Sequence, residues 1–190
     1  CLGGELSQKI LANRIEEAEE AILWFKNLFG EDYYIEIQRH QTDKQHADQH
    51  TYQVQKRVNP ILIELAHKHN VKVIATNDVH FVDEEHSEAH DRLICLSTDQ
   101  FVDNEDRMHY TKQEWLKSPE EMQDLFADIP EAITNTQEIA DKVEVYDIDS
   151  GPLMPKFPIP ETFGTEETYR QRISEQELFK EFTEDENGKT

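Results

Sequence analysis

An aspartate and a histidine two positions apart end the most strand-like run of the chain, VKVIATNDVHF at residues 71–81. Alternate side chains of an extended segment point to the same side, so we expect the Asp78 carboxylate and the His80 imidazole to face one point. Parallel α/β folds place their chemistry beyond the carboxyl ends of their strands, which makes this pair a candidate metal or catalytic site. The alternative is that Asp78 caps the next helix and His80 has no special role, because Asp-x-His alone is an unspecific pattern.

A second predicted strand carries polar side chains that could line the same site. The run Tyr33–Gln38 is rich in aromatic and β-branched residues, which favour strands, and Glu36, Gln38 and His40 share one of its faces. If this face looks into a barrel or cleft, we expect Glu36 and His40 to hold the direct ligands in place rather than to bind a metal themselves. If it looks at solvent, they are ordinary surface residues.

Two long helical patterns flank the predicted strand Tyr33–Gln38. Apolar residues recur at three- to five-residue steps from Glu5 to Phe29, which predicts one helix that ends at Gly30. A second helix is expected from His46 to Asn70. Because Pro60 falls inside it, we expect a kink or a new helix start near Asn59.

The chain beyond residue 82 is expected to be mainly helical. Residues 83–96 begin with three acids, which suit the start of a helix. Thr111–Glu114 resembles a capping box and predicts a short helix over the next residues, including Trp115 and Leu116. The sequence SPEE at residues 118–121 is a strong helix start, and Pro130 begins a further helix. The expected apolar face of the helix at residues 83–96 consists of Ala89, Leu93, Ile94 and Leu96.

Two histidine pairs have the i, i+4 spacing of one helix face, His46 with His50 and His86 with His90. Such a pair can chelate a metal ion. His46 and His50 lie among polar residues, so a solvent-exposed helix face is the favoured interpretation of that pair. It is also favoured for His86 and His90, whose closeness in sequence to His80 leaves the alternative that they are neighbours of the site.

Proline-rich sequence replaces helical sequence after residue 145. The run GPLMPKFPIPETFG at residues 151–164 predicts an extended connector, whose apolar side chains Leu153, Met154, Phe157 and Ile159 are expected to dock on another surface. An amphipathic helix or two is expected from Thr165 to Phe182, followed by a frayed end.

Composition excludes several classes of function. With 41 acidic against 19 basic residues and a net charge of −22, the chain repels phosphate backbones and is not expected to bind nucleic acid alone. Its two cysteines, Cys1 and Cys95, give no disulfide framework, which favours a reducing, cytoplasmic compartment. No apolar run reaches membrane-spanning length, so no membrane partner is expected. The first residue is Cys1 rather than methionine, and we expect the chain to be a piece of a longer polypeptide.

Several of these stretches occur together, in this order, in one family. They are the opening CLGGEL, YYIEIQRH, VNPILIELAHKHN, VIATNDVHF, AHDRLICLST, the segment from YTKQEW to QEIAD, and PLMPKFPIP. Over about residues 1–160 the chain resembles the alpha subunit of bacterial DNA polymerase III, the C-family replicative polymerase. The matching region is the later part of the N-terminal polymerase-and-histidinol-phosphatase (PHP) domain and the connector toward the palm.

This resemblance implies an α/β fold that is part of a distorted (βα)7 barrel. The implied divisions are the C-terminal part of the PHP domain at residues 1–110, a helical extension at 111–145, and a proline-rich connector and helix at 146–190. It also implies a cluster of divalent ions, Zn²⁺ or Mn²⁺, at the carboxyl ends of the strands. Residue by residue, Cys1, Asp78 and His80 match ligands of this cluster, with Asp78 also able to orient a water. The other ligands lie upstream in the family.

The implied function is a part of a DNA-directed DNA polymerase, a nucleotidyltransferase whose own Mg²⁺ site lies outside this chain. The PHP site would act as a metal-dependent 3′–5′ exonuclease, and the isolated fragment is expected to be inactive. The implied partners are DNA, reached through the parent polymerase, the proofreading exonuclease subunit and the sliding clamp. One alternative is an interaction module with a degenerate metal site that docks the proofreading subunit, and another is a stand-alone PHP phosphoesterase.

Overall fold

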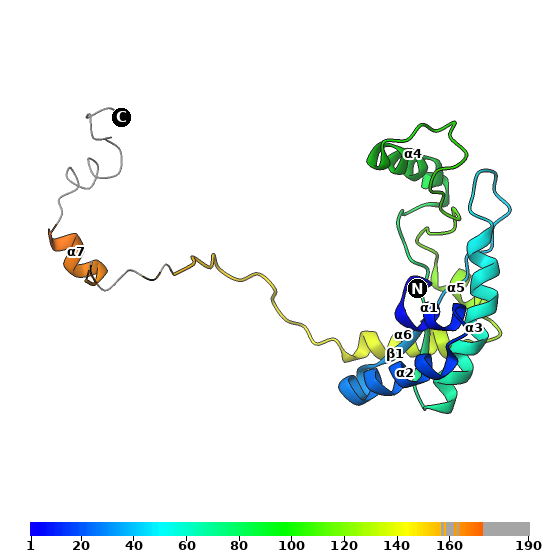
Figure 1. Ribbon diagram of the computed structural model, residues 1–190, viewed down its shortest axis with the longest axis horizontal. Coiled ribbons are helices and arrows are strands. Elements are labelled where there is room, and N and C mark those ends of the chain that lie inside the picture. Colours follow the sequence, from blue (N-terminus) through cyan, green and yellow to red (C-terminus); the bar gives the residue numbers. More distant parts are fainter. Residues whose placement is uncertain (157, 159–161, 163, 173–190) are drawn as a thin grey trace. The chain divides into compact units, whose positions relative to one another are not determined.

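A β-α-β unit lies at the centre of the first of two structural units, Cys1–Glu144. Strand β1 (Tyr34–Ile37), helix α3 (His50–Lys68) and strand β2 (Lys72–Ala75) follow one another, and the strands pair in parallel. The structure is a computed structural model and describes residues 1–156, 158, 162 and 164–172 (Figure 1). The expected mixed α/β class is confirmed. The described residues form a two-stranded sheet, and a closed barrel stays a prediction.

The carboxyl ends of both strands lie at one edge because the strands are parallel, with Ile37 opposite Ala75. The outer edge of β2 is covered by helix α6 (Pro130–Lys142), whose Asn135 side-chain amide donates to the Val73 carbonyl over 2.8 Å. This bond satisfies a strand carbonyl that would otherwise face no partner in the core. The buried apolar residues around the sheet include Ile22, Ile35, Ile37, Val58, Val73, Ala75, Phe126 and Ala132.

The expected single helix from Glu5 to Phe29 is wrong. The structure has two helices, α1 (Glu5–Leu11) and α2 (Ile15–Phe29), separated by a turn. Asn13 in this turn adopts a left-handed backbone with φ of 59°, which no helix can continue through, and asparagine tolerates this conformation better than most residues. The expected end of α2 at Gly30 is confirmed, with φ of 58° at that glycine, and a short 3₁₀ turn, η1 (Gly30–Asp32), leads into β1.

Helix α3 is shorter than expected and continues through Pro60, so the expected new helix near Asn59 is wrong. The neighbouring Asn59 is buried, and its side-chain amide donates to the Gln38 carbonyl over 2.8 Å. Apolar packing and this bond hold the helix against β1 on both sides of the proline, which offsets the lost backbone hydrogen bond.

After β2 the chain forms a 3₁₀ turn, η2 (Glu84–His86), and helix α4 (Ser87–Thr98), which lies apart from the other helices of this unit (Figure 1). The expected apolar face of this helix does not pack inward. Leu93 and Leu96 are 62% and 80% exposed, whereas Ser87, Asp91 and Cys95 are buried. The periodicity predicted the helix correctly but predicted the wrong buried face.

The helix expected after the Thr111–Glu114 capping box is wrong. Lys112 adopts φ of 63°, which is incompatible with a helical turn, and residues 113–118 form no helix. Trp115 pairs in parallel with Phe81, so this segment lies against the chain that follows β2. The helix start expected at Ser118 is confirmed, because α5 (Pro119–Leu125) begins with a capping box. The Ser118 nitrogen donates to the Glu121 carboxylate over 2.8 Å, and the Glu121 nitrogen donates to the Ser118 hydroxyl over 3.2 Å.

The second unit begins at Val145. Residues 145–156 contain neither helix nor strand, as expected for a connector, and helix α7 (Glu166–Arg172) lies within the range in which a helix was expected. Phe157, Ile159 and residues 173–190 lie outside the described part of the chain, so the expectations for them stay predictions. The three expected sequence divisions also stay predictions.

Candidate functional site

The Asp78–His80 segment leaves β2 as a turn and not as an extended strand. Asp78 has φ of 49°, a left-handed conformation in which alternate side chains no longer point the same way. The expected convergence of Asp78 and His80 through strand alternation is therefore wrong. The roles expected for these two residues as metal ligands stay predictions.

Cys1 and Asp78 line one cavity of about 250 Å³, although they are far apart in the sequence. Asp78 follows β2 and so lies where the parallel strands end, and Cys1 lies near it because its nitrogen contacts Glu36 of β1. His40, Asp48 and Glu114 also contribute to the lining of this cavity. A thiol, carboxylates and imidazole are the groups that hold Zn²⁺ and Mn²⁺ in proteins.

Glu36 of β1 joins the segment that carries Cys1 to the end of β2. Its carboxylate accepts hydrogen bonds from the Cys1 nitrogen at 2.8 Å and from the Thr76 hydroxyl at 2.6 Å. Glu36 thus faces the site side of the sheet, and both of its oxygens already have donors.

His40 is buried and both of its ring nitrogens have partners. Nδ1 lies 3.1 Å from Nε2 of Gln55, and Nε2 lies 3.2 Å from the carbonyl oxygen of Asn77. Burial lowers the pKa of His40, so the neutral ring is favoured. A ring with both nitrogens engaged has no free lone pair for a metal, and the supporting role expected for His40 stays a prediction.

His80 lies in an aromatic group beside the cavity. Its Nδ1 is 2.6 Å from the backbone oxygen of Asp78, which can only accept, so Nδ1 carries the proton and Nε2 keeps its lone pair. The Tyr110 hydroxyl is 3.3 Å from that Nε2, and the rings of Tyr110 and His90 lie 4.8 and 5.5 Å from the His80 ring. Burial and the negative charges of Asp78 and Glu114 raise the pKa of Tyr110, which keeps its hydroxyl protonated.

Among the residues that the structure describes, no three or more histidine, cysteine, aspartate and glutamate side chains are grouped closely enough to hold a metal ion. The described chain brings Cys1 and Asp78 to one cavity and leaves His80 at its margin. The donor types fit a divalent ion, and a complete centre needs further ligands in addition to these.

Sequence reasoning missed Glu114, which is 3% exposed and lines the cavity. Its carboxylate accepts from the Thr111 nitrogen and hydroxyl at 3.0 and 2.6 Å and from the Gln113 nitrogen at 2.9 Å. The capping-box pattern of Thr111 and Glu114 did signal this contact, but the contact closes a turn and begins no helix. The Glu114 backbone oxygen then accepts from the His80 nitrogen at 2.7 Å, so this turn also holds the His80 segment.

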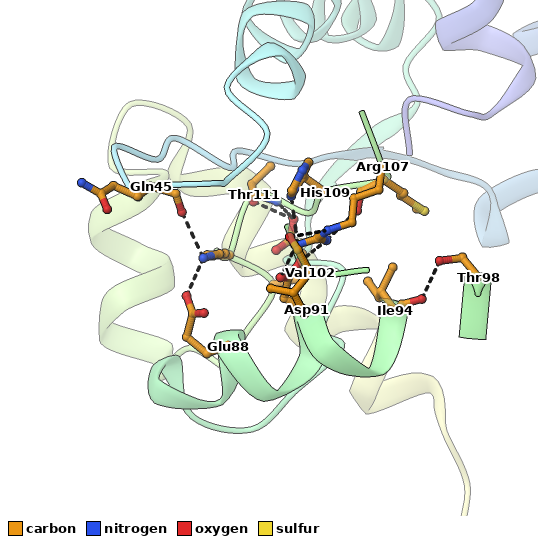
Figure 2. A network of polar contacts seen from close by, with 12 residues as sticks. Gln45, Glu88, Asp91, Ile94, Thr98, Val102, Arg107, His109 and Thr111 are labelled. Atoms are coloured by element: carbon orange, nitrogen blue, oxygen red, sulfur yellow. Dashed lines mark hydrogen bonds and ion pairs between the residues drawn. The ribbon is translucent and has the colours of Figure 1, made fainter. Parts of the chain in front are cut away.

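A buried ion pair connects α4 to the loop that returns from it (Figure 2). The Arg107 guanidinium donates to both carboxylate oxygens of Asp91 over 2.7 and 2.6 Å. His109 lies 3.9 Å from Asp91 in the same network, and Lys112 joins the Glu88 carboxylate to the Gln45 carbonyl. Hydrogen bonding to Arg107 lowers the pKa of Asp91. These contacts explain why the buried face of α4 is polar.

The chain is similar to curated proteins named DNA polymerase III subunit alpha. The protein of that name from Borreliella burgdorferi is 38% identical over 176 residues, which are 92% of this chain and 14% of the relative. Those from Treponema pallidum and Campylobacter jejuni are 36% and 40% identical, over 94% and 77% of this chain and 15% and 11% of their own lengths. The chain thus spans about one seventh of the length of these relatives. No family model matches it.

Among the described residues no helix is both long enough and apolar enough to span a membrane.

Proposed function

Since this chain belongs to the family of bacterial DNA polymerase III alpha subunits, matching one segment of their length, we propose that it is part of the catalytic subunit of a replicative DNA polymerase. Within that subunit it contributes ligands to a divalent-metal site that removes nucleotides from DNA 3′ ends. The observation that carries this proposal is the shared cavity of Cys1 and Asp78 at the carboxyl edge of the sheet. The acidic chain does not attract DNA, so the substrate reaches the site through other parts of the polymerase.

Cys1 and Asp78 would hold the metal, with His80 offering the lone pair of its Nε2. A divalent ion bound there would lower the pKa of a water and stabilise negative charge on a phosphoryl oxygen. The residues around the ligands fix their positions. Glu36 ties the Cys1 segment to the end of β2, and Glu114 holds the His80 backbone. The Asp78 carboxylate can also accept a hydrogen bond from a water and so orient it.

A second candidate function is an interaction module that docks the proofreading subunit. One observation favours it: helix α4 presents Leu93 and Leu96 to solvent. Exposed apolar side chains on one helix face are typical of protein contacts. In this alternative the polar contacts at the sheet edge only stabilise the fold.

Metal content of the full-length protein separates the two candidates. Elemental analysis by mass spectrometry and degradation of a 3′-labelled oligonucleotide would be measured for the wild type, Asp78→Ala and His80→Ala. His86→Ala, an exposed histidine on the neighbouring turn, is the matched control. Bound Zn or Mn that is lost together with nuclease activity in the first two variants, and kept in the control, supports the metal site. A wild-type protein without metal contradicts it and favours the interaction module.

A further inference from the structure

A chain of hydrogen bonds runs from the N-terminal part of α3 to the turn that carries Asp78. Its members are Gln55, His40 and Asn77, which are 2%, 2% and 5% exposed. Gln55 is a polar residue on the buried face of α3, where the sequence pattern expects an apolar side chain. A buried amide needs hydrogen-bond partners, because an unsatisfied one destabilises the fold.

The contacts fix the direction of every bond in this chain. The His40 backbone nitrogen donates to Oε1 of Gln55 over 2.8 Å, so the other end of that amide is the NH₂ group, which can only donate. This group lies 3.1 Å from Nδ1 of His40, and Nδ1 must therefore accept. A neutral ring then carries its proton on Nε2, which lies 3.2 Å from the Asn77 carbonyl, an acceptor. Each donor thus meets an acceptor.

Asn77 is held from its other side as well. Its side-chain amide donates to the carbonyls of Gln113 and Trp115 over 2.8 and 2.7 Å. The next residue, Asp78, has the left-handed φ of 49°, a conformation that costs free energy and persists only where its surroundings enforce it. The peptide between Asn77 and Asp78 is where the chain turns from the strand into this conformation, and the bond from His40 acts on that peptide.

We propose that Gln55 is a positioning residue, which sets the tautomer of His40 and through it fixes the peptide that directs Asp78 into the cavity. The functional consequence rests on the proposed role of Asp78 as a metal ligand, whereas the hydrogen-bond chain itself does not. The favoured neutral state of the buried His40 ring agrees with this assignment.

The tautomer of His40 tests the hydrogen-bond chain independently of any metal. NMR of the full-length protein with ¹⁵N-labelled histidine rings should show His40 neutral with its proton on Nε2. In Gln55→Glu the carboxylate still accepts from the His40 backbone nitrogen but offers no proton to Nδ1, so Nδ1 should become protonated. Gln53→Glu, the same change at an exposed position of α3, should leave His40 unchanged. A protonated Nδ1 in the wild type, or an unchanged ring in Gln55→Glu, overturns the proposal.

Two substitutions of His40 test the effect on the site. In His40→Gln the side-chain amide reaches the position of Nε2 and can still donate to the Asn77 carbonyl, whereas the shorter amide of His40→Asn cannot. We expect hydrogen exchange in peptides covering residues 76–82 to be faster in His40→Asn than in His40→Gln. Mn²⁺ binding, measured by calorimetry, should weaken about tenfold or more in His40→Asn and stay within about twofold in His40→Gln, as for other residues that orient metal ligands.

The outcomes separate the two proposals. An equal loss of Mn²⁺ affinity in His40→Asn and His40→Gln shows that the ring only contributes packing, and it overturns the positioning role. A wild-type protein that binds no Mn²⁺ contradicts the proposed function, and the NMR and exchange results then still decide whether Gln55 positions the turn.

Discussion

Replacing Asp91 by asparagine should loosen helix α4 and leave the β-α-β unit intact. The Asp91 and Arg107 side chains are 10% and 2% exposed, and two hydrogen bonds of 2.6 and 2.7 Å join them. Removing one partner of a buried ion pair leaves the other charge without compensation, which costs about 3 kcal/mol. Because each 1.4 kcal/mol is a factor of ten, amide hydrogens of α4 should exchange roughly 100-fold faster.

Hydrogen exchange of the full-length protein, followed by mass spectrometry, measures this effect in peptides of α4 and α3 separately. Asp103 is an exposed acid in the same loop, and the control Asp103→Asn should change hydrogen exchange neither in α4 nor in α3. A double change of Asp91→Leu with Arg107→Met should restore much of the protection, since an apolar pair can replace a buried ion pair. Unchanged exchange of α4 in Asp91→Asn would refute the reasoning.

The same ion pair predicts how α4 responds to acid. Arg107 lowers the pKa of Asp91 in the folded chain, so the stabilisation is complete above the unfolded-state pKa of about 3.9. It is lost as the pH falls from there through the lower folded-state pKa. Exchange of α4, corrected for the intrinsic rate, should therefore accelerate below about pH 4 in the wild type. Asp91→Asn, which has no carboxyl at this position, should lack that acceleration.

Three further predictions concern the packing around β1 and β2. Arg39→Met should lower the stability of the α5–α6 turn by about 1 kcal/mol, because Arg39 donates to both oxygens of the partly exposed Asp128, and exchange of peptides covering residues 125–130 checks this. Asn135→Ala should speed exchange in β2 roughly fivefold, since the Val73 carbonyl loses a hydrogen bond worth about 1 kcal/mol. Burial lowers the pKa of Lys117 to about 8, so its amine should react with acetic anhydride increasingly as the pH rises through about 8. Peptide mass spectrometry of the acetylated sites measures this, and no rise in that range would contradict it.

Local patterns predicted the elements that hold the site. Both strands, the end of α2 at Gly30 and the capping box at Ser118 depend on neighbouring residues, whose propensities act whatever the rest of the fold does. The β-α-β order then placed Asp78 beyond the carboxyl end of β2. These inferences needed no long-range information.

Long-range contacts explain the wrong predictions. Helix α4 buries Asp91 and not its leucines because Arg107, sixteen residues later, pairs with that carboxylate. The turn at Lys112 replaces the expected helix because the following segment pairs with Phe81. Gln55 and Glu114 carried no signal of a site role, since their partners at the sheet edge are fixed only once the fold brings the segments together. A single sequence does not show which distant residues come into contact.

Titration with Co²⁺, which adopts the ligand sets of Zn²⁺, decides whether Cys1 and Asp78 hold a divalent ion. In the full-length protein we predict a saturable near-ultraviolet band from a thiolate bound to cobalt. The band should disappear in Cys1→Ser and require more Co²⁺ in Asp78→Asn. It should persist in Cys95→Ser, which removes the buried second cysteine of this chain. No band in the wild type, or a band that survives Cys1→Ser, would contradict the proposed metal site.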